Sequence, residues 1–153
     1  MRANEAGLPC LVFTDLRVVD DSLNVISTSM FKYQNLKIPN SLDQLLVSNA
    51  FTGCTLMINN SLVRLMTFPS VALMHDWWVA IELFKHKGKA IFVDRATIAY
   101  RQHATNSVGA KSSGIFSKLI KLLKFKNTLN ELRLQYNQYK YVTNGGVVKF
   151  FFK

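Results

Sequence analysis

The chain has 153 residues and a mass of 17.4 kDa, with 49% hydrophobic and 18% charged residues. This composition predicts one globular domain with a hydrophobic core, and it excludes disordered, collagen-like and coiled-coil proteins. The net charge of +10 is concentrated in the tail, because residues 111–153 carry 9 Lys/Arg and one Glu (net +8), whereas residues 1–110 carry 10 Lys/Arg and 8 Asp/Glu (net +2).

The sequence shows no signal for membrane insertion or secretion. Residues 44–63 form the longest uncharged stretch, but polar residues interrupt it, so we expect no transmembrane segment. The N-terminus lacks the apolar core of a signal peptide, and Cys10 and Cys54 are too few for a disulfide framework. These features predict a cytoplasmic protein with reduced thiols.

The first expected element is a strand. Residues 10–14 are apolar and predict a buried strand that delivers Asp15 to its C-terminal end, where ligands bind in open α/β sheets. The sequence Asp-Asp-Ser at 20–22 predicts a turn. Ser41 and Gln44 have capping-box spacing, which predicts a helix that ends near residue 49.

A second strand and two helices are expected next. The apolar run 54–58 predicts the strand, and residues 59–61 predict the cap of a short helix. The apolar spacing within residues 77–84 predicts a longer helix with Asp76 at its N-cap and Gly88 closing it.

Two further strands, at 90–94 and 97–100, and a basic helix at about 115–141 complete the expected order. The alternation of strands and helices predicts an α/β fold in residues 1–110. The composition changes near residue 111, so we expect residues 111–153 to form a basic amphipathic helical appendage.

Three polar clusters lie at ends of expected elements, at residues 14–15, 75–76 and 101–103. The free amides and the macrodipole of a helix N-terminus stabilise a carboxylate, so we expect Asp76 to be ionised at neutral pH and able to accept a proton. The same position also suits an ordinary helix cap. The histidines lack the spacing of a helical zinc site.

Read in order, these clusters belong to segments that resemble the C-terminal half of bacterial family 2 glycosyltransferases. The resemblance runs from about residue 10 to residue 111 and is closest to rhamnosyltransferase-like members, which build O-antigen and cell-wall polysaccharides. Its most specific feature is HDWW followed by YRQHxxN at this separation. The segments are FTDL at 13–16, NAFTGCT at 49–55, MHDWW at 74–78 and YRQHATNSVG at 100–109.

The resemblance implies a Rossmann-like fold of the GT-A type and transfer of a sugar from a nucleotide-diphosphate donor to an acceptor hydroxyl with inversion. It implies that Asp76 is the general base. It places Arg101 and His103 near the donor diphosphate and its divalent cation, and His103 as a direct ligand would suit manganese better than magnesium.

The same resemblance places acceptor-binding residues around Asp76, namely Thr52, Gly53, His75, Trp77 and Trp78. One tryptophan would lie against the apolar face of a sugar ring, or both would simply belong to the core. Gly53 would permit a close backbone approach to the acceptor sugar, or would only form a turn.

The family's N-terminal strands, which bind the nucleotide, and its Asp-x-Asp metal motif have no counterpart before Cys10. We therefore expect an incomplete GT-A domain, the acceptor half of a truncated or split enzyme. Without the missing strands, residues 10–14 would present an unpaired apolar edge, which predicts marginal stability or self-association.

Two functions from different classes remain open. The first is a glycosyltransferase acting on a glycan or lipid-linked acceptor at the inner face of the membrane. Lys118, Lys121 and Lys124 would attract anionic lipid there, although the same helix also suits a core-packing appendage. The second is an inactive remnant or a non-enzymatic basic module that binds a membrane surface. Nucleic acid is not expected as a partner, because the aromatic residues of the tail form no recognisable binding motif.

Overall fold

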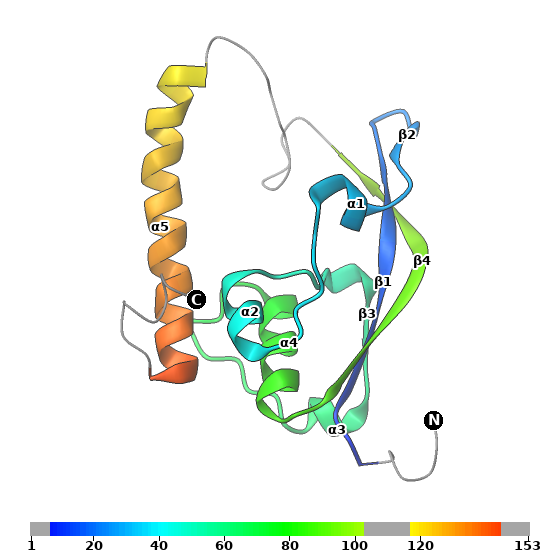
Figure 1. The fold of residues 1–153 in the computed structure, drawn as a ribbon, viewed down its shortest axis with the longest axis vertical. Helices are drawn as coiled ribbons and strands as arrows, with labels where there is room; N and C mark the ends of the chain where they lie inside the picture. The colour runs from blue at the N-terminus through cyan, green and yellow to red at the C-terminus, as the bar shows by residue number, and fades with distance from the viewer. Residues whose placement is uncertain (1–6, 103–116, 145–153) are drawn as a thin grey trace.

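The computed structural model describes residues 7–102 and 117–144, with residues 117–128 described by their backbone only. Figure 1 shows a small sheet, two central helices beside it and one long helix beyond them. In chain order the elements are β1 (Cys10–Val19), β2 (Val25–Ser27), α1 (Met30–Gln34), α2 (Leu42–Val47), a 3₁₀ turn (Gly53–Thr55), β3 (Leu56–Ile58), α3 (Asn60–Val63), α4 (His75–Lys85), β4 (Lys89–Arg101) and α5 (Ser117–Thr143).

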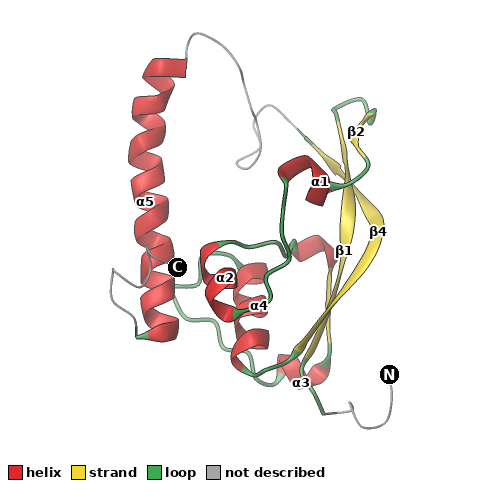
Figure 2. Ribbon diagram, viewed as in Figure 1, coloured by secondary structure: helices red, strands yellow, loops and turns green. Residues whose placement is uncertain are grey.

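The sheet is built around β1, which has partners on both edges (Figure 2). β4 runs parallel to β1 over its whole length. On the opposite edge, β3 pairs antiparallel with residues 11–13, and β2 pairs antiparallel with Val18 and Val19. The expectation of an unpaired apolar edge at residues 10–14 is therefore wrong, because other strands of the same chain supply both neighbours.

The register between β1 and β4 is interrupted at Asp15. Thr14 lies opposite Val93, Asp15 opposite Ala96, and Leu16 opposite Ile98, so β4 accommodates extra residues at this point. Such a bulge bends a strand without ending it. The two strands expected at 90–94 and 97–100 are therefore one strand, β4, and Asp15 lies in the middle of β1 rather than at its end.

Several short-range predictions are confirmed. Ser41 caps α2 by accepting the N–H of Gln44 at 3.3 Å, and Asn59 caps α3 by accepting the N–H of Leu62 at 3.0 Å. The predicted turn after β1 is held by Asp20, whose Oδ1 accepts the N–H groups of Ser22 and Asn24. These contacts join residues no more than four positions apart.

Other boundaries differ from the prediction. β3 starts at Leu56 because the residues before it form the 3₁₀ turn. α4 begins at His75 with Met74 as its N-cap, so Asp76 lies in the first turn of the helix and not at the cap. After α4 the left-handed residue is Lys87 (φ 53°), whereas Gly88 allows a close approach: a Cβ there would lie 2.7 Å from the carbonyl oxygen of Pro9.

One hydrophobic core joins the sheet to the helices. It includes Leu11 and Phe13 from β1, Trp78 and Ile81 from α4, and Tyr139 from α5, which is 1% exposed. The last turns of α5 therefore share the core of the α/β portion, as the core-packing alternative anticipated. The boundary expected at residues 110 and 111 and the side chains of Lys118, Lys121 and Lys124 lie outside the described part of the chain.

In the described ranges, no helix combines the length and the apolar character that crossing a bilayer requires. α5 is long, but lysines recur along its sequence, together with Glu131 and Arg133.

Candidate functional site

A cleft of about 380 Å³ opens at the start of α4. Its walls come from α1 and the loop after it, from residues 47–52, from β4 and from α5. Three of the four segments that carry the glycosyltransferase resemblance contribute to this one cleft. The lining residues are Met30, Gln34, Leu36, Val47, Ser48, Asn49, Ala50, Phe51, Thr52, Met74, Asp76, Trp77, Tyr100 and Gln135.

Among the described residues that line the cleft, Asp76 is the only carboxylate, and it is 5% exposed. Its Oδ1 accepts the N–H of Trp77 at 2.7 Å, and its Oδ2 accepts the N–H of Gly53 at 2.9 Å. These bonds hold the carboxylate at the N-terminal end of an 11-residue helix. Because each carboxylate oxygen can accept more than one hydrogen bond, Asp76 keeps acceptor capacity at the cleft wall.

The backbone of Gly53 lies directly against the start of α4. A Cβ at this position would meet Nε2 of His75 at 2.6 Å and Oδ2 of Asp76 at 3.4 Å. Gly53 therefore lies close to His75 and Asp76, and its approach to an acceptor sugar stays a prediction. Thr52 lines the cleft beside it, whereas His75 is exposed and is not part of the cleft lining.

The two tryptophans after Asp76 are held by hydrogen bonds inside the protein. Trp77 is 5% exposed, borders the cleft, and donates its indole N–H to the carbonyl of Leu45 at 2.6 Å. Trp78 is fully buried, donates to the carbonyl of Thr67, and has the ring of Tyr141 against it. The structure thus favours the core alternative for Trp78, whereas Trp77 belongs to the core and also lines the cleft.

Asp15 is buried in a different place and has a structural contact. Its Oδ1 accepts the N–H groups of Met30 at 3.0 Å and Phe31 at 3.4 Å, the first two residues of α1. A helix leaves its first N–H groups without partners, and Asp15 satisfies two of them. Asp15 is not among the cleft-lining residues. The expectation that it lies at the C-terminal end of a strand is wrong, because β1 continues to Val19.

Arg101 and His103 are the two residues predicted near the donor diphosphate. Arg101 is exposed at the end of β4, opposite Val19 of β1, and does not line the cleft. His103 lies outside the described residues. In the part of the chain that the structure describes, no three His, Cys, Asp or Glu side chains are grouped to hold a metal ion.

Some cleft residues had no predicted role. Tyr100 belongs to the YRQH motif, but it had no role assigned, although its place just before Arg101 put it near the expected site. Asn49, which opens another motif, accepts the N–H of Phe51 and so shapes the cleft backbone. Gln135 comes from α5, and no local pattern indicated that this helix would reach the cleft.

Comparison with known proteins found no counterpart: no family model, no curated protein and no solved structure matches the chain.

Proposed function

We propose that this chain is the acceptor-side part of an inverting glycosyltransferase, with Asp76 as the general base. The donor would be a nucleotide-diphosphate sugar, with rhamnose as the sugar that the resemblance suggests. The acceptor would be a glycan, free or lipid-linked, at the inner face of the cell membrane.

The observation that carries this proposal is the convergence of the motifs on one cleft. Asp76, Thr52 and Tyr100 are far apart in the chain, and each lines the cleft at the start of α4. A buried carboxylate facing a cleft that also offers hydroxyl and amide groups suits a ligand rich in hydroxyls.

In the proposed reaction, the acceptor hydroxyl hydrogen-bonds to Asp76 and loses its proton to that carboxylate. The acceptor oxygen forms a bond to the anomeric carbon as the bond from that carbon to the diphosphate oxygen breaks, and the electron pair leaves with the diphosphate. A hydroxyl is a weak nucleophile, and a positioned base contributes about 10²–10⁴-fold to the rate.

The N–H of Gly53 and the first turn of α4 would hold the Asp76 carboxylate in place during this step. The motion of the proton is then short and needs no rearrangement of the protein. The hydrogen bond from the indole N–H of Trp77 to the carbonyl of Leu45 would hold the first turn of α4, which carries Asp76, in place.

A divalent cation would offset the charge of the leaving diphosphate in this type of reaction. The described residues do not provide a set of ligands for this cation. The proton transfer to Asp76 is therefore described without a metal. His103 stays the proposed ligand, and Arg101 the proposed partner of the diphosphate.

The test is release of the nucleoside diphosphate from dTDP-sugars and UDP-sugars, mixed with fragments of bacterial surface polysaccharides. We expect wild-type turnover and a loss of about 10²–10⁴-fold in Asp76→Asn, because an amide cannot accept the proton. The matched control is Asp94→Asn, which removes an exposed carboxylate on β4 and should leave turnover unchanged.

Titration calorimetry with dTDP and UDP, with and without Mn²⁺, separates binding from chemistry. We expect Asp76→Asn to bind nucleotide as well as the wild type does, and His103→Ala to lose metal-dependent binding. Unchanged turnover in Asp76→Asn would overturn the base assignment. A wild-type chain that neither binds nucleotide nor releases it would instead support the inactive remnant or the basic membrane-binding module.

A further inference from the structure

A second and larger cleft, of about 650 Å³, adjoins the cleft at Asp76. Gln34, Leu36, Val47 and Ser48 line both of them, so the two clefts are neighbours that share part of their walls. We call the second one the outer cleft. Both volumes lie within the range of about 300–1,000 Å³ that is usual for small-molecule sites.

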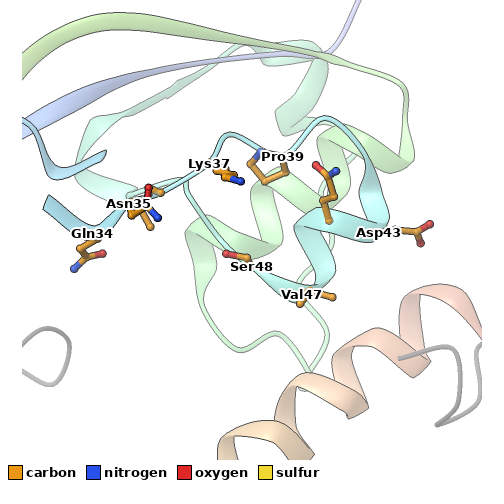
Figure 3. A pocket seen from close by; sticks show the side chains of 9 residues that line it. Gln34, Asn35, Lys37, Pro39, Asp43, Val47 and Ser48 are labelled. Carbon is orange, nitrogen blue, oxygen red and sulfur yellow. The ribbon is translucent and has the colours of Figure 1, made fainter. Parts of the chain in front are cut away.

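The outer cleft lies between the loop that follows α1 and the helix α2. Figure 3 shows Gln34 and Asn35 toward one end, Asp43 at the other, and Pro39 and Ser48 between them. The shape depends on Asn35, which ends α1 in the left-handed conformation at φ 53° and turns the chain away from the helix.

The polar groups of the outer cleft are mainly neutral amides and a hydroxyl. Within the described residues, the side chains of Gln34, Asn35 and Ser48 are not engaged in hydrogen bonds to the protein, and all three are exposed. Each can both donate and accept a hydrogen bond. These groups match the hydroxyls of a sugar, which also donate and accept.

Apolar and charged groups narrow the class of ligand further. Leu36, Pro39 and Val47 give the cleft an apolar wall, which suits the C–H faces of sugar rings. Lys37 and Asp43 are the two charged residues of the lining and have opposite signs. The formal net charge of this lining is zero. A polyanion such as a nucleic acid would therefore gain little from binding to it.

We infer that the two clefts form one groove for an uncharged oligosaccharide acceptor. The terminal sugar would lie at Asp76, and the sugar units that precede it in the acceptor would lie in the outer cleft. This inference rests on the proposed function for the position of the terminal sugar, and it adds that the acceptor has more than one sugar unit.

The test is binding of the purified chain to an array of neutral fragments of bacterial surface polysaccharides, from single sugars to hexasaccharides. Calorimetry with the best trisaccharide and its terminal monosaccharide then gives affinities. The key variant is Asn35→Gly, which removes an amide of the outer cleft and keeps the left-handed backbone that glycine adopts freely. The matched control is Asn144→Gly, since Asn144 is also left-handed (φ 51°) and follows the end of α5 away from both clefts.

We expect affinity to rise with the length of the oligosaccharide. We expect Asn35→Gly to weaken trisaccharide binding by about tenfold, as the loss of one or two hydrogen bonds would do. Monosaccharide binding in Asn35→Gly and trisaccharide binding in Asn144→Gly should equal the wild-type values. Equal affinity for short and long fragments, no binding of any fragment, or no effect of Asn35→Gly would each overturn the inference.

The two proposals fail in distinguishable ways. Length-dependent binding that Asn35→Gly weakens, without any release of nucleoside diphosphate, would support the oligosaccharide groove and contradict the transferase. Nucleoside diphosphate release could instead be equally fast with the monosaccharide and the trisaccharide, both in the wild type and in Asn35→Gly. This result would support the transferase and overturn the inference of an oligosaccharide groove. Competition by dTDP for the trisaccharide would assign the outer cleft to the donor and overturn the inference as well.

Discussion

Two buried carboxylates, Asp15 on β1 and Asp76 on α4, are equally buried and differ in what surrounds them. Both are 5% exposed, and both accept backbone N–H groups. Asp15 directs one oxygen to three N–H groups, including the first two of α1, and so joins that helix to the sheet. Asp76 accepts one N–H on each oxygen and borders a cleft.

Burial and backbone hydrogen bonds are therefore common to both carboxylates and do not distinguish the one that borders a cleft. Each of these groups satisfies backbone donors that would otherwise be costly to bury. What separates them is the open space beside Asp76. We therefore expect substitutions near Asp15 to change stability, and substitutions near Asp76 to change ligand binding and turnover.

The largest effect on stability is expected for Asp15→Ala. The N–H groups of Met30 and Phe31 would lose their acceptor in a buried place, which should cost about 3 kcal/mol. Urea denaturation measures this as a lower midpoint. Asp15→Asn keeps an acceptor oxygen and should lose less. An unchanged midpoint in Asp15→Ala would show that the carboxylate does not hold α1 to the sheet.

Gly53→Ala should affect the surroundings of Asp76, and therefore turnover more than stability. The new Cβ would lie 2.6 Å from Nε2 of His75 and push that ring aside, whereas its 3.4 Å distance to Oδ2 of Asp76 is an ordinary contact. Because His75 precedes Asp76 in the first turn of α4, we expect this displacement to lower turnover about tenfold. Stability should change by less than about 1 kcal/mol, because the exposed His75 side chain can move. The double variant Gly53→Ala with His75→Ala tests the cause, since removing the ring should restore part of the turnover. Additive losses would contradict the steric account.

Gln138→Leu should loosen the segment that leads into α4. Gln138 is fully buried, and its Oε1 accepts the N–H of Leu73 at 3.1 Å. We expect a loss of about 1 kcal/mol and faster hydrogen exchange at the Leu73 amide, with the Met30 amide unaffected. Asn137→Leu, at an exposed position beside it, is the control. Equal exchange rates at Leu73 in all three proteins would contradict this role of α5.

The smallest effect on stability is expected for a substitution in the turn after β1, at Asn24. The side chain of Asn24 is the main cause that holds the pKa of Asp20 below its ordinary value of 3.8, and backbone hydrogen bonds from Asn24 and Ser22 add to it. A lowered folded-state pKa stabilises the protein above pH 3.8, and this contribution is lost as the pH falls through the folded-state pKa. Asn24→Ala should raise the pKa of Asp20, which carbon NMR of the carboxyl group measures. A pKa that stays the same would assign the shift to the backbone alone.

Contacts between near neighbours were predictable from the sequence. The caps at Ser41 and Asn59 and the turn at Asp20 each depend on a side chain and a backbone group at most four residues apart. Residue type and spacing decide such contacts almost alone. The start of α4 was predicted two residues late, because Asp76 has the chemistry of a cap while Met74 holds that position.

Long-range pairing was not predictable in this way. An unpaired edge was predicted at residues 10–14 because the neighbours of a strand depend on the whole chain. β4 was predicted as two strands because a bulge resembles a break in the sequence pattern. In the same way, nothing local to Gln135 or Tyr139 indicated that α5 reaches the cleft and the core.

The sequence by itself determined the α/β alternation, the local caps and turns, and the motifs whose residue types suit proton transfer. The tertiary structure decided which carboxylate joins a helix to the sheet and which borders open space. Asp15 and Asp76 share one side-chain chemistry, and only the packing of α1, α4, α5 and the segment 47–53 around them leaves a cleft beside Asp76.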